Sequence, residues 1–480
     1  MNAPLVWIVL PGVYAAILFL MRRWGRAVVV MGILVSILLA WLAWTEPIGE
    51  TLILGSLRIK LDDTLFVLGR RFVLRPSDAP VLTMIYLGAA FWFGGATVAR
   101  AGSFFVPIGL AIAALLTAAI AVEPFLYAAL LIELVTIISI PLISPLGRPV
   151  GRGVLRYLTF QTLAMPLILF TGWILAGVEA SPADSSLVLH GNILLALGFA
   201  FLLAIFPFHT WVPMLAAESH PFVAAFIFYI LSLGITFLGI GFLERYLWLR
   251  TSSNSYALLQ FVGMLMVVLG GLWAAFQVHL GRILGYAVLM ETGLSLLTVS
   301  IGPAGELLPP SLEILFSSML PRGLAFGIWA LALTTLAAYG DGDGEGETEE
   351  RLSFDRMRGK GRKFPIAVGL LMMANLSLAG FPLLAGFPVR LALWNALAQK
   401  SVLAAVVALL GSVGLLTGCL RSLAILTAGG DEVPWTMTEQ WSERIMFFLG
   451  GLALLLVGIL PQWFLPALGR MTQIYLSSHP

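Results

Sequence analysis

The sequence predicts an all-α polytopic membrane protein with about 14 transmembrane helices. Hydrophobic residues make up 60% of the 480 residues and charged residues only 11%, with a mean hydropathy of +0.98, whereas a soluble domain needs far more surface charge. Apolar runs of about 18 residues or more recur along the whole chain, and each can cross the hydrocarbon core. The runs lack the apolar/polar alternation of barrel strands, so helices are expected to satisfy the backbone within lipid.

The predicted helices follow these apolar runs. In order they are Leu5–Met21, Ala27–Trp44, Pro80–Ala99, Phe104–Val122, Phe125–Ile143, Val154–Gly177, Asn192–Phe206, Pro221–Leu243, Tyr256–Val278, Ile283–Ile301, Ser311–Tyr339, Ile366–Leu397 with a break, Val402–Leu426 and Ile445–Phe464. The first run has no basic region before it and no small-residue cleavage site, so it is interpreted as a membrane helix and not a signal peptide.

Four regions are expected. Residues 1–100 hold the first three helices and an extramembrane hairpin at 51–75, which the alternating, β-branched pattern there predicts. Residues 101–245 and 255–428 form two repeats, the second with a cytoplasmic loop at 340–364, and residues 429–480 hold a C-terminal helix. Within the loop, Asp341–Glu350 is acidic and Gly-rich and is expected to be solvated.

Orientation follows from the basic residues of short loops, which favour the cytoplasm. Three odd-numbered loops carry them: Arg22, Arg23 and Arg26; Arg148, Arg152 and Arg156; and Arg358, Lys360, Arg362 and Lys363. Both termini are therefore predicted to lie outside. The hairpin opposes this signal with Arg70, Arg71 and Arg75.

Composition excludes several functions. The net charge of +2 suggests no nucleic-acid partner. The single cysteine, Cys419, cannot form an internal disulfide, and no Cys/His cluster offers a metal site. We therefore expect no metal and no cofactor in this chain.

Two proline-rich segments interrupt the seventh and the twelfth predicted helices. Pro207 lies in Ile205–Pro213, and Pro382 and Pro388 lie in Gly380–Pro388. Proline removes an amide donor and clashes with the preceding turn, so both helices should break there. Matching breaks predict inverted repeats, helices four to eight and nine to thirteen, with an ion or substrate pathway at the breaks. The alternative is two unrelated turns that contain Pro and Phe.

Several ionisable residues fall within or beside predicted membrane helices. Glu133 and Glu291 lie near the middle of theirs, where a carboxylate costs about 2.5–3.5 kcal/mol on insertion scales and should face the protein interior. Glu133 is a candidate proton relay, or else an inert group held by hydroxyls. Arg322 and Arg390 follow prolines in later helices. They could stabilise a carboxylate or a water chain but not shuttle protons, or they could snorkel to an interface.

Three further residues lie beside the breaks and helix ends. His209 either titrates near neutral pH or caps the broken helix. Glu218 and His220, in the connection after the first break, could form a pathway mouth or two solvated loop positions. Arg282 opens the helix that holds Glu291 and is a second candidate for a pathway mouth.

Four motifs resemble one known family. Phe206–Pro213 followed by Glu218 resembles PFHxWxP…E, Leu131–Leu134 resembles FWEL, Gly281–Tyr286 resembles KRxLAY, and Leu378–Phe387 resembles LAGLPxxxGF. Together they are similar to the antiporter-like membrane subunits of respiratory complex I, a family that includes Mrp-type cation/proton antiporters and membrane subunits of energy-converting hydrogenases. The resemblance spans the fourth to the thirteenth helix.

The resemblance implies a chain of titratable residues, and this sequence departs from it. The family's helix-five glutamate is Glu133. Its lysines of helices seven and eight fall at Leu202 and Ser232, and its helix-ten histidine at Glu291. Its helix-eleven histidine and lysine fall at Ser318 and Arg322, and its helix-twelve ionisable residue at Arg390. The expected path therefore runs through Glu133, His209, Glu291, Arg322 and Arg390, or the subunit has lost pumping.

Three functions remain open. The first is a proton-translocating subunit of a quinone oxidoreductase or related complex in a prokaryotic plasma membrane, beside other membrane and peripheral subunits that hold the redox chemistry. The second is a structural subunit with the same fold. The third is a stand-alone ion or solute transporter that uses the two broken helices.

Overall fold

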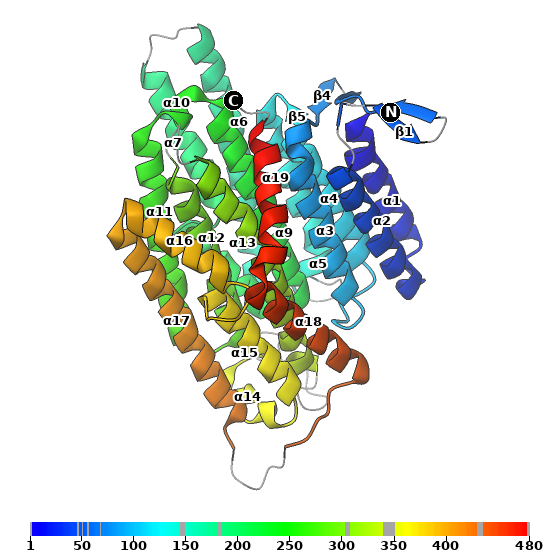
Figure 1. Ribbon diagram of the computed structural model, residues 1–480, viewed down its shortest axis with the longest axis vertical. Coiled ribbons are helices and arrows are strands. Elements are labelled where there is room, and N and C mark those ends of the chain that lie inside the picture. The colour runs from blue at the N-terminus through cyan, green and yellow to red at the C-terminus, as the bar shows by residue number, and fades with distance from the viewer. Residues whose placement is uncertain are drawn as a thin grey trace.

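The computed structural model shows an all-helical body with small β-hairpins at one end (Figure 1). It describes residues 2–45, 48–49, 51–54, 57–67, 69–144, 149–180, 185–302, 308–338, 351–429 and 435–477. Within these residues, nine helices are long and apolar enough to cross a membrane and four shorter ones are apolar. The predicted all-α polytopic membrane fold is confirmed.

The helices before the second repeat follow the predicted order. They are α1 (Leu10–Leu20, after a π-helical turn at Leu5–Val9), α2 (Gly25–Thr45), α3 (Ala79–Gly95), α4 (Phe105–Ala121), α5 (Ala128–Ile143), α6 (Arg152–Ala180), α7 (Ser185–Leu202), α8 (Trp211–Glu218), α9 (Pro221–Arg245) and the short α10 (Leu247–Arg250).

The later helices are α11 (Ser253–Phe276), α12 (Leu280–Ser300), α13 (Leu308–Ala338), α14 (Phe354–Met357), α15 (Pro365–Ala379), α16 (Phe387–Lys400), α17 (Val402–Thr427), α18 (Trp441–Ile459) and α19 (Leu465–Ser477). The last predicted helix, Ile445–Phe464, is wrong at its end. Pro461 stops α18, and the amphipathic α19 follows and packs on α13 and α3. Its mixture of polar residues with buried Leu468, Met471 and Tyr475 hid it from a search for apolar runs.

The region between α2 and α3 forms two hairpins where a single hairpin was predicted. Strand β1 (Thr51–Leu54) pairs antiparallel with β2 (Leu57–Lys60), and β3 (Thr64–Val67) pairs with β4 (Arg70–Val73). A two-residue strand β5 (Val122–Glu123), at the end of α4, extends the second hairpin. Glu123 lies within 3.8 Å of three arginines, Arg71, Arg75 and Arg245, which ties this hairpin to α9.

Two five-helix units show the same pattern of neighbours. In the first, α4 packs on α5 and α9, α5 on α6, and α6 on α7. In the second, α11 packs on α12 and α17, α12 on α13, and α13 on α15. The broken helix is α7–α8 in the first unit and α15–α16 in the second. These units are the predicted repeats, and α12 lies between them because it also packs on α8 and α9.

The described ends of the chain lie at one end of the molecule, and α14 lies at the other (Figure 1). The part of the predicted cytoplasmic loop that precedes α15 is packed and not free, because Met357 is fully buried and Gly359 donates its amide to the Ile425 carbonyl. The acidic stretch Asp341–Glu350 lies outside the described residues.

Candidate functional site: a buried ion-pair cluster at the second broken helix

Both broken helices end in the same backbone motif. After α15, Gly380 adopts φ +81°, its amide donates to the Ser377 carbonyl, and the Phe381 amide donates to the Leu376 carbonyl. This is a Schellman cap, in which a left-handed residue closes the last turn. After α7, Ala204 takes the left-handed position at φ +53° with the equivalent pair of bonds.

The prolines predicted to break the helices lie beyond these caps. Pro207 precedes a short 3-10 turn before α8, Pro382 lies in the loop after α15, and Pro388 is in the first turn of α16. Pro388 costs nothing there, because the first amides of a helix have no partner within it. The predicted breaks are confirmed at both places.

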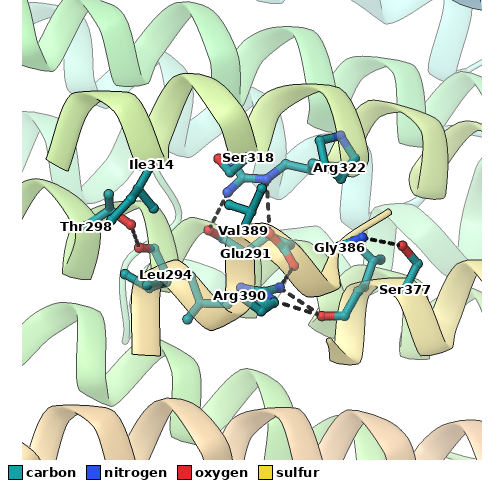
Figure 2. A pocket seen from close by; sticks show the side chains of 13 residues that line it. Glu291, Leu294, Thr298, Ile314, Ser318, Arg322, Ser377, Gly386, Val389 and Arg390 are labelled. Carbon is teal, nitrogen blue, oxygen red and sulfur yellow. Dashed lines mark hydrogen bonds and ion pairs between the residues drawn. The ribbon is translucent and has the colours of Figure 1, made fainter. Parts of the chain in front are cut away.

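Glu291 on α12 is held between two arginines (Figure 2). Arg322 on α13 places its Nε 3.1 Å from Glu291 Oε2, and Arg390 on α16 donates from Nη2 to Glu291 Oε1. Only 4%, 3% and 7% of Glu291, Arg322 and Arg390 are exposed. The alternative that these arginines snorkel to an interface is therefore wrong. We call these three residues the charged cluster.

Both arginines also donate hydrogen bonds to backbone carbonyls. Arg390 donates from Nε and Nη2 to the Leu378 carbonyl, at 3.2 and 2.9 Å. That carbonyl belongs to the last turn of α15, where helix carbonyls lack partners. Arg322 donates from Nη2 to the Glu291 carbonyl at 3.1 Å and to the Ser295 hydroxyl at 2.8 Å. The charged cluster thus fastens the two halves of the broken helix to α12 and α13.

A small cavity of about 30 Å³ adjoins the charged cluster. Its lining includes all three charged residues with Thr298, Ser318 and Ser377. A cavity of this size has room for about two water molecules. The site therefore combines a carboxylate, two fixed cations and space for water at a helix break.

The first repeat has a carboxylate, but no cation beside it among the described residues. Glu133 on α5 accepts a hydrogen bond from the Thr162 hydroxyl at 2.8 Å, and its second oxygen is buried without a hydrogen bond to any described residue. No arginine, lysine or histidine lies within 4.0 Å of this carboxylate in the described chain. Glu133 and the charged cluster are therefore separate sites.

The two positions at which the resemblance implied lysines lie together. Leu202 at the end of α7 and Ser232 on α9 line a second cavity of about 30 Å³, together with Trp211 and with Thr292, which neighbours Glu291 on α12. The lining is mostly apolar. The structure thus brings Leu202 and Ser232 together, and none of the described residues that line this cavity is charged.

The remaining predicted residues have structural contacts. Glu218 accepts the Gly153 amide at 2.7 Å, where an anion is stabilised by the α6 N-terminus. The His209 ring stacks on Phe206 with centroids 5.3 Å apart. Arg282 lies in the first turn of α12, whose first amides are capped by His279 Nδ1. None of these side chains touches the charged cluster.

Sequence reasoning missed three partners. Ser295 lies one turn after Glu291, so helical spacing could have revealed it. Thr162 and the Leu378 carbonyl lie far along the chain from the groups they bind, and no sequence signal marks them. Gln161 was also missed. It donates to the Leu202 carbonyl at 3.2 Å and so caps the first broken helix as Arg390 caps the second.

These features define a polytopic membrane protein built from two broken-helix repeats with a buried charged centre. Residues 158–417, more than half of the chain, match the family described as NADH:quinone oxidoreductase/Mrp antiporter, transmembrane. The chain belongs to this family.

Curated relatives agree with this. NADH-quinone oxidoreductase subunit N from Azoarcus sp. is 25% identical over 65% of this chain and 65% of its own length. The protein of that name from Deinococcus radiodurans is 26% identical over 66% of this chain and 62% of its own. The chain thus spans less than two thirds of these two relatives. Subunit 14 of the Thermus thermophilus enzyme is 27% identical over 90% of this chain and 96% of its own.

Solved structures share the fold. A chain of the Mrp complex from Dietzia sp. has a TM-score of 0.77 at 17% identity. The match covers 98% of this chain and 97% of the Mrp chain. A chain of respiratory complex I from Thermus thermophilus has a TM-score of 0.74 at 22% identity, with 98% and 99% coverage. A chain of an archaeal membrane-bound sulfane sulfur reductase has a TM-score of 0.79 at 16% identity, with 99% coverage of each.

Proposed function

We propose that this chain is a proton-translocating, antiporter-like membrane subunit of a complex I-like quinone oxidoreductase or related energy-converting complex. The observation that carries the proposal is the Glu291 carboxylate, buried between two guanidinium groups beside a water-sized cavity at a broken helix. Ionisable groups inside a membrane protein mark ion pathways. The names of the curated relatives support a quinone-linked complex.

The partners in this proposal are the other membrane and peripheral subunits, the lipid bilayer and protons. The redox chemistry belongs to those other subunits. The chain lies in a prokaryotic plasma membrane with both termini outside. The grouping of both ends away from α14 supports that orientation (Figure 1).

The geometry suggests how Glu291 is coupled to movement. A proton on Glu291 removes the negative charge that both guanidiniums contact, so two charge-assisted hydrogen bonds weaken. Arg322 sits on the continuous helix α13, whereas Arg390 sits on the half-helix α16. Movement of α16 away from α12 would separate one of the two cations from Glu291. Arg322 and Arg390 stay charged throughout, because guanidinium does not release its proton.

The first repeat would supply protons to this site. Glu133, His209 and intervening water form the proposed approach, with Glu218 and Arg282 near its mouth. The cavity at Leu202 and Ser232 is uncharged, so this part of the path has the fewest groups that could carry a proton. The proposal therefore places the control of translocation in the second repeat.

The test is proton pumping by the assembled complex in proteoliposomes, measured per electron transferred. Glu291→Gln is expected to reduce pumping at least about tenfold while the complex still assembles, and Glu291→Asp should retain part of it. Glu133→Gln is expected to reduce pumping as well. Pumping that is unchanged in Glu291→Gln would contradict the proposal.

A non-pumping structural role is the second candidate, and the apolar cavity at Leu202 and Ser232 favours it. Two titratable amines are replaced there by a hydrocarbon and a hydroxyl, neither of which changes charge between pH 5 and 8. In this case both glutamine variants would pump normally, and Glu291→Gln would weaken only assembly. A stand-alone transporter would instead be active without any redox subunit.

A further inference from the structure

The charged cluster carries one positive charge in excess. Two guanidiniums surround one carboxylate, and Glu291 is the one acidic residue among the described residues that line the cavity. Arginine keeps its proton in proteins. A buried charge without a counter-charge is costly, and natural proteins pair such charges. The cluster therefore needs one more negative charge.

The arginines also have unused hydrogen-bond donors. Arg322 uses Nε and Nη2, and its buried Nη1 has no partner in the described residues. Arg390 uses Nε and Nη2 as well, so its Nη1 remains available to the cavity that its side chain lines.

The cavity wall offers a further donor. Ser377 accepts the Gly386 amide at its hydroxyl oxygen, 3.0 Å away, so its own hydroxyl proton remains for another acceptor. Ser318 and Thr298 also line the cavity, although both donate to carbonyls of their own helices. Space for about two waters can hold one halide ion in their place.

We propose that this cavity binds a small monovalent anion, with chloride as the physiological ligand. The anion lies against Arg390 and Ser377, neutralises the excess charge and fixes the half-helix α16 to α12. Binding does not require that the chain translocate protons, so this inference and the proposed function can fail separately.

Direct detection uses the intact complex prepared in bromide in place of chloride. Anomalous scattering at the bromine edge should show one site bounded by Glu291, Arg322 and Arg390. Arg390→Gln should lose the site, because the remaining Glu291–Arg322 pair is neutral. A wild-type cavity that holds only water at saturating bromide overturns the proposal.

A second measurement asks whether chloride stabilises the complex. The thermal unfolding midpoint should rise with chloride and saturate at constant ionic strength in gluconate, as for any ligand that binds the native state alone. Ser318→Asp places a carboxylate in the cavity, and it should abolish this dependence while both arginines remain. Glu313→Gln alters an exposed carboxylate on the same helix and should keep the chloride dependence. A wild-type midpoint that does not change with chloride, or equal chloride dependence in all three proteins, contradicts the proposal.

Discussion

The two repeats share a backbone plan but differ in how they hold charge. In the first, Glu133 meets one hydroxyl, and the α7 cap is bound by the neutral Gln161. In the second, Glu291 meets two guanidiniums, one of which also caps α15. Equivalent helix breaks are thus closed by a neutral amide in one repeat and by a cation in the other.

This difference separates the fold from its function. A helix break needs only a donor for the exposed carbonyls, and either an amide or a guanidinium supplies one. A charged donor adds a field that acts on a nearby carboxylate, and a neutral one does not. In the second repeat the capping residue therefore also acts electrostatically on a carboxylate, whereas in the first repeat it only closes the helix.

Removing the central carboxylate should have the largest effect on stability. Glu291→Gln leaves two guanidiniums facing each other in a buried site, and breaking a buried ion pair costs about 3–5 kcal/mol. Equilibrium unfolding of the purified chain in detergent measures the loss. Replacing all three charged residues together, as Glu291→Leu, Arg322→Met and Arg390→Leu, should be neutral or stabilising. Equal losses in both variants would show that packing, and not charge, holds this site.

Restoring a family lysine tests the neutral character of the first repeat. Leu202→Lys places an ammonium in the cavity shared with Ser232, and the expected loss of stability is about 2.5–3.5 kcal/mol on insertion scales. Leu202→Met is the uncharged control and should lose less than about 1.5 kcal/mol. A lysine tolerated as well as methionine would mean that water already reaches this cavity, and the contrast between the repeats would weaken.

Substitution of the two left-handed cap residues tests whether both broken helices depend on this cap. Gly380→Ala places a Cβ at φ +81° and about 3.0 Å from the Arg390 side chain, so it should cost about 1–2 kcal/mol. Ala204→Gly relieves the same left-handed conformation in the first repeat and should stabilise the protein by up to about 1 kcal/mol. Gly369→Ala, in α15 with open space around it, is the control and should stabilise by about 0.5–1 kcal/mol. Urea unfolding of the three variants ranks them, and a neutral Gly380→Ala would contradict the cap.

The sequence predicted the fold better than the site, for physical reasons. Apolar runs and prolines act locally, so helices and both breaks could be predicted from neighbouring residues. Gln161 and Arg390 could not be recognised as caps, because each binds a carbonyl on another helix. The pairing of Glu291 with Arg322 and Arg390 joins three helices, and a single sequence contains no signal for such a contact. The amphipathic α19 was missed because Arg470, Thr472 and Gln473 interrupt its apolar residues.

The last prediction concerns the single hydrogen bond of Glu133. Thr162→Val removes the donor 2.8 Å from Glu133 Oε1 but keeps the shape of the side chain. The variant should lose about 1.5–3 kcal/mol of unfolding free energy if the hydrogen bond is made to a charged group. It should lose about 0.5–1.5 kcal/mol if the bond is made to a neutral group. Thr159→Val, on the exposed side of α6, removes only a bond to the Leu155 carbonyl and is the matched control. A loss in the lower range would mean that this hydrogen bond contributes no more than one between neutral groups. A loss in the upper range would mean that the first repeat also holds a charge, which water solvates or a neighbouring subunit pairs.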